Sequence, residues 1–173
     1  MIDGERVRLR PMADGDTDEV VRMRSEPDVL GQLFSAAPPT RESHRRWLDA
    51  VRASDDRQEF MIVDRVSGRS VGTIGLSHID RRHRRAEYGI LIGEADARGK
   101  GLASEASRLL LDHAFRTLAL NRVYLHVFSD NEPAIRLYER VGFRREGVLR
   151  GHVYKDGRFR DVVVMGALGS AAA

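Results

Sequence analysis

The stretch with the clearest chemical potential is a glycine-rich turn, Arg98–Ala103, which follows an apolar segment over residues 86–93. That segment contains tyrosine and isoleucine, and it predicts a buried strand. Two glycines, Gly99 and Gly101, then stand where a helix is expected to begin. Helix N-termini bind phosphate because they present unpaired N–H groups and partial positive charge, and glycines let the backbone approach closely. The turn therefore predicts a phosphate-bearing ligand held by main-chain groups.

Two other phosphate-binding motifs do not fit this turn. A Walker A loop requires GxxxxGK followed by Ser or Thr, but Gly93 lies one residue too far from Gly99, and Gly101 occupies the hydroxyl position. A dinucleotide fingerprint requires GxGxxG, and Ser104 stands at its third glycine. Both motifs fail at a residue with a chemical role, which leaves the pattern R-x-x-G-x-A over residues 98–103.

A second motif, N-x-x-A-x-x-L-Y-x-x-x-G-F, runs from Asn131 to Phe143. The two motifs, in this order and on the expected strand–turn–helix and strand–helix units, resemble the GNAT superfamily of N-acetyltransferases, which use acetyl-CoA. The resemblance extends from about residue 6 to residue 168. The segments RRAEYGI and EGVLRGHVYKDGRFRDVVVMG are similar to the RimJ/RimL branch and to its bacterial spermidine/spermine N-acetyltransferase relatives.

The resemblance implies an α+β fold of the GNAT type. Its central sheet would be mixed and mostly antiparallel, with helices on both faces and strands splayed at the acetyl-CoA site. Residue patterns predict strands over 6–10, 58–64, 70–79, 86–93, 122–127, 148–154 and 159–165, and helices over 14–24, 40–52, 102–118 and 133–141. We expect a single acetyltransferase domain over residues 1–168 and a short disordered tail over 169–173.

The resemblance also implies how acetyl-CoA would be held. Backbone amides of the turn and the Ser104 hydroxyl would grip the pyrophosphate, with added charge from Arg98 and Lys100. The strand edge at residues 91–93 would pair with the amide groups of the pantetheine arm, as a peptide adds to a sheet edge. Asn131 would contact the pantetheine, cap its helix, or do both. The expected cofactor-binding residues are Leu91, Ile92, Gly93, Arg98, Gly99, Lys100, Gly101, Leu102, Ala103, Ser104, Asn131, Ala134 and Tyr138.

Acetyl transfer from a thioester to an amine also requires an acid for the departing thiolate. Tyr138 resembles the general acid of the family. A phenol of pKa about 10 can protonate a thiolate of pKa about 8.5. The alternative is a core tyrosine, because Tyr138 shares a helix face with Ala134 and Leu137.

An amine of pKa near 10 arrives protonated, so a base must remove its proton directly or through water. Glu87, on the central strand, is the candidate base, and its alternative role is to pair with Arg84 or Arg85. His78 and His126 are the other candidate bases. No histidine spacing typical of a metal site occurs, and we predict no metal.

Composition limits the classes of function. The chain of 173 residues has 42% hydrophobic and 32% charged residues, no apolar run of transmembrane length and no signal peptide, so we expect a cytoplasmic protein without a membrane partner. The absence of cysteine excludes disulfides and thiol catalysis. Arginines are spread along the chain without an aromatic stacking platform, so we expect no nucleic acid. The run Arg81–Arg85 is expected to be a solvated loop, with contact to a CoA phosphate or an acidic partner as the alternative.

These observations predict an acetyl-CoA-dependent N-acetyltransferase that acts on a primary amine by direct attack in a ternary complex. We expect the acceptor to be a polyamine or another small amine; a protein N-terminal amine, as in ribosomal-protein acetyltransferases, and an amino sugar remain open. Glu26 and Asp28 alone supply acid near the substrate-shaping region, a thin lining for a polycation. An inactive acyl-CoA-binding sensor is the alternative class, against which the presence of Glu87 and Tyr138 argues. The sequence leaves a homodimer open.

Overall fold

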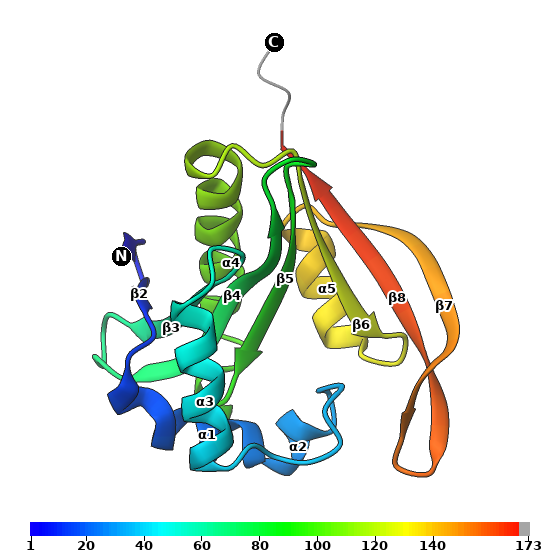
Figure 1. Cartoon of the computed structure of the whole chain (residues 1–173), viewed down its shortest axis with the longest axis horizontal. Helices are drawn as coiled ribbons and strands as arrows, with labels where there is room; N and C mark the ends of the chain where they lie inside the picture. Colours follow the sequence, from blue (N-terminus) through cyan, green and yellow to red (C-terminus); the bar gives the residue numbers. More distant parts are fainter. Residues whose placement is uncertain (170–173) are drawn as a thin grey trace.

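Eight strands form one mixed sheet (Figure 1). They are β1 (Ile2–Asp3), β2 (Val7–Pro11), β3 (Gln58–Asp64), β4 (Ser70–Asp80), β5 (Arg85–Ile92), β6 (Arg122–Phe128), β7 (Arg144–Lys155) and β8 (Arg158–Leu168). Their order in the sheet is β1-β2-β3-β4-β5-β6-β8-β7, and every neighbouring pair is antiparallel except β5 and β6. The computed structural model describes residues 1–169 and confirms the predicted α+β fold.

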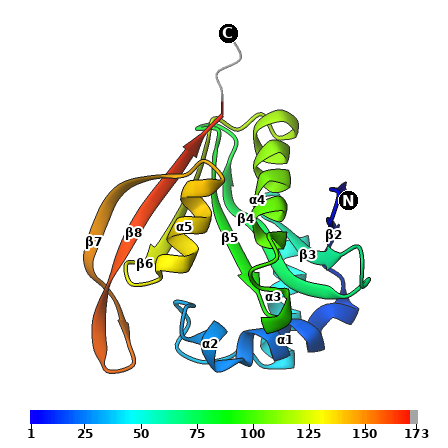
Figure 2. The same cartoon turned by 180° about the vertical axis from the view of Figure 1, so that it is seen from behind.

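Helices cover both faces of the sheet. They are α1 (Thr17–Ser25), α2 (Pro27–Leu30), α3 (Arg41–Arg52), α4 (Leu102–Asp112) and α5 (Glu132–Arg140). On one face, Met23 of α1 and Leu48 of α3 pack with Leu91 of β5. On the other face, which is turned toward the viewer in Figure 2, Leu110 of α4 and Ile135 of α5 join the larger core. The central strands are therefore buried between two layers of helices.

The parallel pair β5–β6 is the irregular point of the sheet. Its register runs only from Arg85↔Arg122 to Glu87↔Tyr124. Beyond Glu87, β5 stays paired with β4 as far as Ile92, and β6 stays paired with β8 as far as Phe128. The two strands consequently diverge toward α2 (Figure 1). This is the splay expected from the resemblance.

Several element boundaries differ from the sequence prediction. The helix expected over residues 102–118 is α-helical only to Asp112 and continues as a π-helical turn over His113–Thr117, in which the Leu118 N–H donates to the His113 carbonyl. Strand β1 and the short helix α2 were not predicted, because two and four residues are too few for periodicity to mark them.

The expected disordered tail begins at Gly169, whose N–H donates to the Asn121 carbonyl at 2.9 Å. The rest of that tail, residues 170–173, lies outside the described residues. Within residues 1–169, none of the helices is both long enough and apolar enough to cross a membrane.

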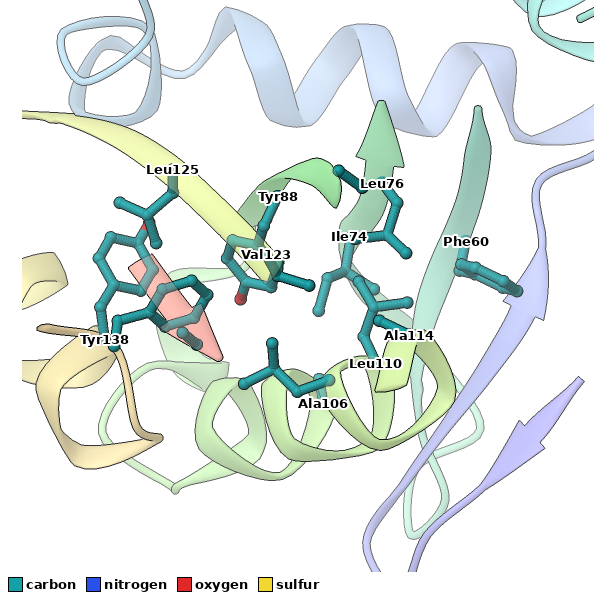
Figure 3. Close-up of a cluster of buried hydrophobic side chains, with 14 of the residues drawn as sticks. Phe60, Ile74, Leu76, Tyr88, Ala106, Leu110, Ala114, Val123, Leu125 and Tyr138 are labelled. Carbon is teal, nitrogen blue, oxygen red and sulfur yellow. The ribbon is translucent and has the colours of Figure 1, made fainter. Parts of the chain in front are cut away.

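A relay of two buried hydroxyl groups fixes α4 on β5, and Figure 3 shows the first of them, on Tyr88, directed toward α4 within the hydrophobic core. The Tyr88 and Ser107 hydroxyl oxygens lie 2.7 Å apart, and Ser107 donates to the Ala103 carbonyl at 2.6 Å. Since Ser107 has one proton to donate, Tyr88 must donate to Ser107. The relay ties the first turn of α4, and with it the glycine-rich turn, to the central strand.

We predict that Ser107→Ala lowers the free energy of unfolding by about 1–3 kcal/mol, because the Tyr88 hydroxyl would remain buried without an acceptor. Urea unfolding monitored by circular dichroism measures the change. The double variant Tyr88→Phe/Ser107→Ala removes both polar groups and should be more stable than Ser107→Ala alone. A double variant less stable than the single one would contradict this account.

Candidate active site

The glycine-rich turn has the backbone shape that a phosphate cradle needs. Gly99 and Gly101 adopt φ of 75° and 77°, a left-handed conformation that side chains disfavour. Gly101 is the N-cap of α4, so the free N–H groups of the first helical turn begin directly after it. No atom lies within 4 Å of the place where a Cβ on Gly99 would stand. The turn can therefore hold an anion on backbone N–H groups and the positive end of α4.

The far N-terminal part of the chain braces this turn, which sequence reasoning missed. Arg6 donates from Nη1 to the Lys100 carbonyl at 2.9 Å and from Nε to Glu105 Oε2 at 3.0 Å. The Glu105 carboxylate also accepts from the Arg6 backbone N–H, and Arg6 is the main cause that holds its pKa below the usual value against the effect of burial. Because the two residues lie 99 positions apart, no local pattern could have paired them.

A cavity of about 920 Å³ extends from the turn into the splay between β5 and β6. Of the expected cofactor-binding residues, it is lined by Leu91, Ile92, Arg98, Gly99, Gly101, Leu102, Ala103, Ser104, Asn131, Ala134 and Tyr138. Lys100 and Gly93 are not among the lining residues. Gly93 instead faces α1, where a Cβ would lie 2.2 Å from Met23 Cγ. We refer to this space as the cofactor cavity.

Helix α5 forms one wall of the cofactor cavity. Asn131 Oδ1 accepts from the Ala134 N–H at 3.3 Å, so the predicted cap is present. Tyr138 is 8% exposed and packs edge-on against Tyr88, with ring centroids 5.9 Å apart. Burial raises the pKa of Tyr138 to about 12. The phenol therefore stays protonated at any working pH.

Glu87 lies between two histidines. Its Oε1 is 2.7 Å from His126 Nδ1, and its Oε2 is 3.0 Å from His78 Nδ1. Carboxylate oxygens accept hydrogen bonds, so Nδ1 is the donor in each of these two contacts. The three residues proposed as alternative bases thus form one hydrogen-bonded unit, and the alternative pairing of Glu87 with Arg84 or Arg85 does not occur in the described structure.

A β-bulge aims His78 at this unit. The β4–β5 register shifts between Ser77 and Asp80, and His78 adopts φ of 50° within the bulge. In the loop that follows, His83 and Arg85 both pair with Asp80. This loop precedes β5, whereas the glycine-rich turn follows it, so the arginines of residues 81–85 lie at the opposite end of β5 from that turn.

A second cavity, of about 530 Å³, lies on the α1–α3 side of the sheet, and we refer to it as the acceptor cavity. It shares part of its lining with the cofactor cavity, namely Leu33, Glu87, Tyr88, Gly89, Ile90 and Leu91. His78 lines only the acceptor cavity and His126 only the cofactor cavity. Glu87 therefore stands where the two spaces meet.

Sequence reasoning also missed Glu59, which lines the acceptor cavity. Burial raises the pKa of this carboxyl to about 7, against the opposing effect of Arg57 and Arg24. The position of Glu59 in β3 could have indicated that its carboxyl is buried. Glu59 and Met61 lie on the same face of the strand, and Met61 is fully buried.

The loop after α2 contributes Leu33 to the lining of both cavities, and the C-terminal hairpin holds this loop in place. Lys155 Nζ donates to the carbonyls of Leu30 at 2.6 Å and Ser35 at 2.9 Å, and also to that of Leu33. Arg160 of β8 donates to the Gly31 carbonyl at 3.1 Å. The loop carbonyls are thus satisfied by cations from the other end of the chain.

A glycine turn at a helix start, a splayed central strand pair and two cavities that meet at a carboxylate define a GNAT-type acetyltransferase. Residues 6–144 match the family described as "Acetyltransferase (GNAT) domain", and the chain belongs to this family.

Among curated relatives, it is 31% identical over 163 residues to spermidine N(1)-acetyltransferase of Escherichia coli, covering 92% of this chain and 84% of the relative. It is 35% identical over 154 residues to spermidine N(1)-acetyltransferase of Vibrio cholerae, and the match covers 89% of this chain and 88% of that relative. The crystal structure of the Vibrio cholerae spermidine N-acetyltransferase with CoA and spermine superposes with a TM-score of 0.89 at 27% identity, covering 95% of this chain and 96% of that one.

We predict that acetyl-CoA at 100 times its Kd raises the melting temperature by about 5–10 °C, because it binds only the folded state. Gly99→Asp should abolish most of this shift, since its carboxylate would stand in the phosphate cradle. Differential scanning fluorimetry measures both effects. Gly99→Asn is the matched control, because it carries the same left-handed strain without the charge. If acetyl-CoA raised the melting temperature of both variants equally, the pyrophosphate would bind elsewhere.

Proposed function

We propose that the protein transfers an acetyl group from acetyl-CoA to a primary amine by direct attack in a ternary complex, with Glu87 as base and Tyr138 as acid. The observation that carries this proposal is the place of Glu87 at the junction of the two cavities. An amine in the acceptor cavity and a thioester in the cofactor cavity could meet beside this carboxylate. Acetyl-CoA supplies the activated acyl group, and the rest of the chemistry is positioning and proton transfer.

The proton of the attacking amine is taken up by the unit around Glu87. The carboxylate removes it directly or through one water, and the new C–N bond forms as the C–S bond breaks. His78 faces the acceptor cavity and its Nδ1–H holds one carboxylate oxygen of Glu87, and the proton that Glu87 takes up passes on to water in that cavity. His126 holds the other carboxylate oxygen and fixes its direction.

The edge of β5 supplies the remaining contacts. Beyond Glu87 this edge is not paired with β6 in the described residues, so its N–H and C=O groups are available to an extended ligand arm. A main-chain N–H near Leu91 or Ile92 would face the thioester oxygen and stabilise the charge that develops there.

Tyr138 would return a proton to the departing thiolate. Its phenol, with a pKa of about 12, is a weaker acid than an exposed tyrosine. The same burial that weakens the phenol also raises the pKa of a thiolate released beside it, which narrows the difference between donor and acceptor. In this proposal the Tyr138 phenol can therefore still protonate the thiolate in the buried wall of the cofactor cavity.

The acceptor is a small primary amine in this proposal. The names of the two spermidine N(1)-acetyltransferases make a polyamine the first candidate to assay. A peptide N-terminal amine is the second, because Arg24 and Arg57 line the acceptor cavity and guanidinium groups bind carboxylate and carbonyl oxygens. Release of free CoA thiol in the presence of amine separates an enzyme from an inactive acyl-CoA sensor.

We predict that Glu87→Gln lowers kcat/KM by about 10²–10⁴-fold at neutral pH and by much less near pH 10, where free amine accumulates without a base. Thiol release over a pH series measures the profile. Glu146→Gln is the matched control, since that carboxylate pairs with Arg122 and lines neither cavity. A loss independent of pH would make Glu87 a binding residue.

We predict that Tyr138→Phe lowers kcat by about 10²–10⁴-fold while the Kd for acetyl-CoA changes little, because the ring and its packing remain. Steady-state kinetics and calorimetric titration separate the two quantities. Tyr154→Phe, at a site 64% exposed, is the control and should be neutral. Near-normal kcat together with lower stability would assign Tyr138 to the core alone.

A further inference from the structure

The end of the acceptor cavity away from Glu87 carries polar groups that the reaction does not use. They are Arg24 of α1, His44 of α3, and Arg57 and Glu59 at the start of β3. Arg24 forms no ion pair or side-chain hydrogen bond within the described part of the chain, and its pKa is lowered chiefly by burial. Arg57 reaches only the neighbouring Asp56, at 3.9 Å. Arg24 therefore lines this space without an ion pair in the described residues, and Arg57 has only the long contact with Asp56.

His44 supplies an independent sign that a ligand belongs here. The residue is 4% exposed, its Nδ1 lies 3.2 Å from Thr17 Oγ1, and its Nε2 is buried with no hydrogen-bond partner in residues 1–169. Burial, followed by the nearby Arg24, lowers the pKa of His44, so the ring is neutral at pH 7. A neutral imidazole carries one N–H, so Nε2 donates in the tautomer whose Nδ1 accepts from Thr17 and accepts in the other tautomer. Buried polar atoms are almost always satisfied, so an orphan on a cavity wall indicates a missing partner.

Glu59 lies on the sheet that forms the floor of the acceptor cavity. It pairs in register with Gly75, which pairs in turn with Gly89 of β5. A Cβ on Gly75 would stand 2.3 Å from Glu59 Oε2, so only glycine leaves room for this carboxylate, while the corresponding place on Gly89 is empty. Two strand spacings, about 10 Å, separate Glu59 from Gly89. A chain of a few carbons could thus run over Gly89 from the transfer centre toward this end of the cavity.

The charges at this end favour an anion. Arg24 and Arg57 each carry a full positive charge, whereas Glu59, with a pKa of about 7, carries on average about half a negative charge at neutral pH. The groups that face Glu59 are those two arginines and the glycine floor. Asp56 offsets the charge of Arg57, and the full positive charge of Arg24 exceeds the half negative charge of Glu59, so the net charge at this end is positive.

We propose that Arg24 and Arg57, with His44, bind an anionic group carried by the acceptor, so that this enzyme acetylates amines that bear a carboxylate a few carbons from the reacting nitrogen. The inference rests on the proposed function and names its substrate class. It also separates this chain from the spermidine enzymes that it resembles, because a second ammonium group would meet two guanidinium groups at the position where the carboxylate is proposed to bind.

The test compares acceptors that differ only in the end of the chain remote from the reacting amine. The panel is pentylamine, 1,5-diaminopentane and 5-aminopentanoate, with the corresponding series of three, four and six carbons, each assayed by thiol release. We expect the carboxylate series to exceed the alkylamine series in kcat/KM by about 10- to 100-fold, mostly through KM. Arg24→Gln and Arg57→Gln should each lower the ratio of kcat/KM for the carboxylate to kcat/KM for the matching alkylamine by at least 10-fold. Arg45→Gln, at an exposed site on α3 that does not line the cavity, is the matched control.

A binding measurement keeps the inference separate from the proposed reaction. Pentanoate has no amine, so its calorimetric titration reports the anion site without turnover, and it should bind the wild type and not Arg24→Gln. Arginine-dependent pentanoate binding without thiol release from any amine would uphold the anion site and refute the proposed transfer to small amines. Preference for the diamine series, or pentanoate binding that both arginine variants retain, would overturn the inference.

Discussion

The structure depends on the early end of one strand pairing. After Glu87, β5 and β6 separate, while each keeps its other neighbour. The divergence leaves a row of backbone groups without sheet partners and opens a passage between the two layers of helices. It also places Glu87, at the last paired position, where both cavities can reach it. Every other feature of the site either braces this opening or lines it.

The bracing is long-range and mostly polar. Arg6 and Glu105 hold the glycine-rich turn from the N-terminal strand side, and the Tyr88–Ser107 relay holds the first turn of α4 from below. Such contacts fix a loop without filling it with side chains, so the backbone N–H groups remain exposed to a ligand. The site thus combines an open backbone surface with rigid support, as tight binding of a long flexible cosubstrate requires.

The fold and the cofactor side were largely predictable from sequence, because their determinants are local. Gly99 and Gly101 mark a turn by conformation, and Asn131 marks a helix start by its cap. The acceptor side was not predictable in this way. His78 reaches Glu87 only through a bulge, and Arg24 shares a cavity with Arg57 because α1 packs on the sheet. A Cβ on Gly93, which is expected to bind pantetheine through its backbone, would collide with Met23, a contact that periodicity cannot reveal.

The clamp of Lys155 and Arg160 on the loop after α2 has a consequence for the order of assembly. The contacts of Lys155 with the carbonyls of Leu30 and Ser35 join residues 125 and 120 positions apart. Contacts between residues so far apart close large loops. They form late in folding, because the chain loses the entropy of loop closure before the contact adds any stabilisation. During synthesis the loop after α2 cannot make these contacts until the β7–β8 hairpin has left the ribosome. A nascent chain therefore lacks these contacts until Lys155 and Arg160 have been added.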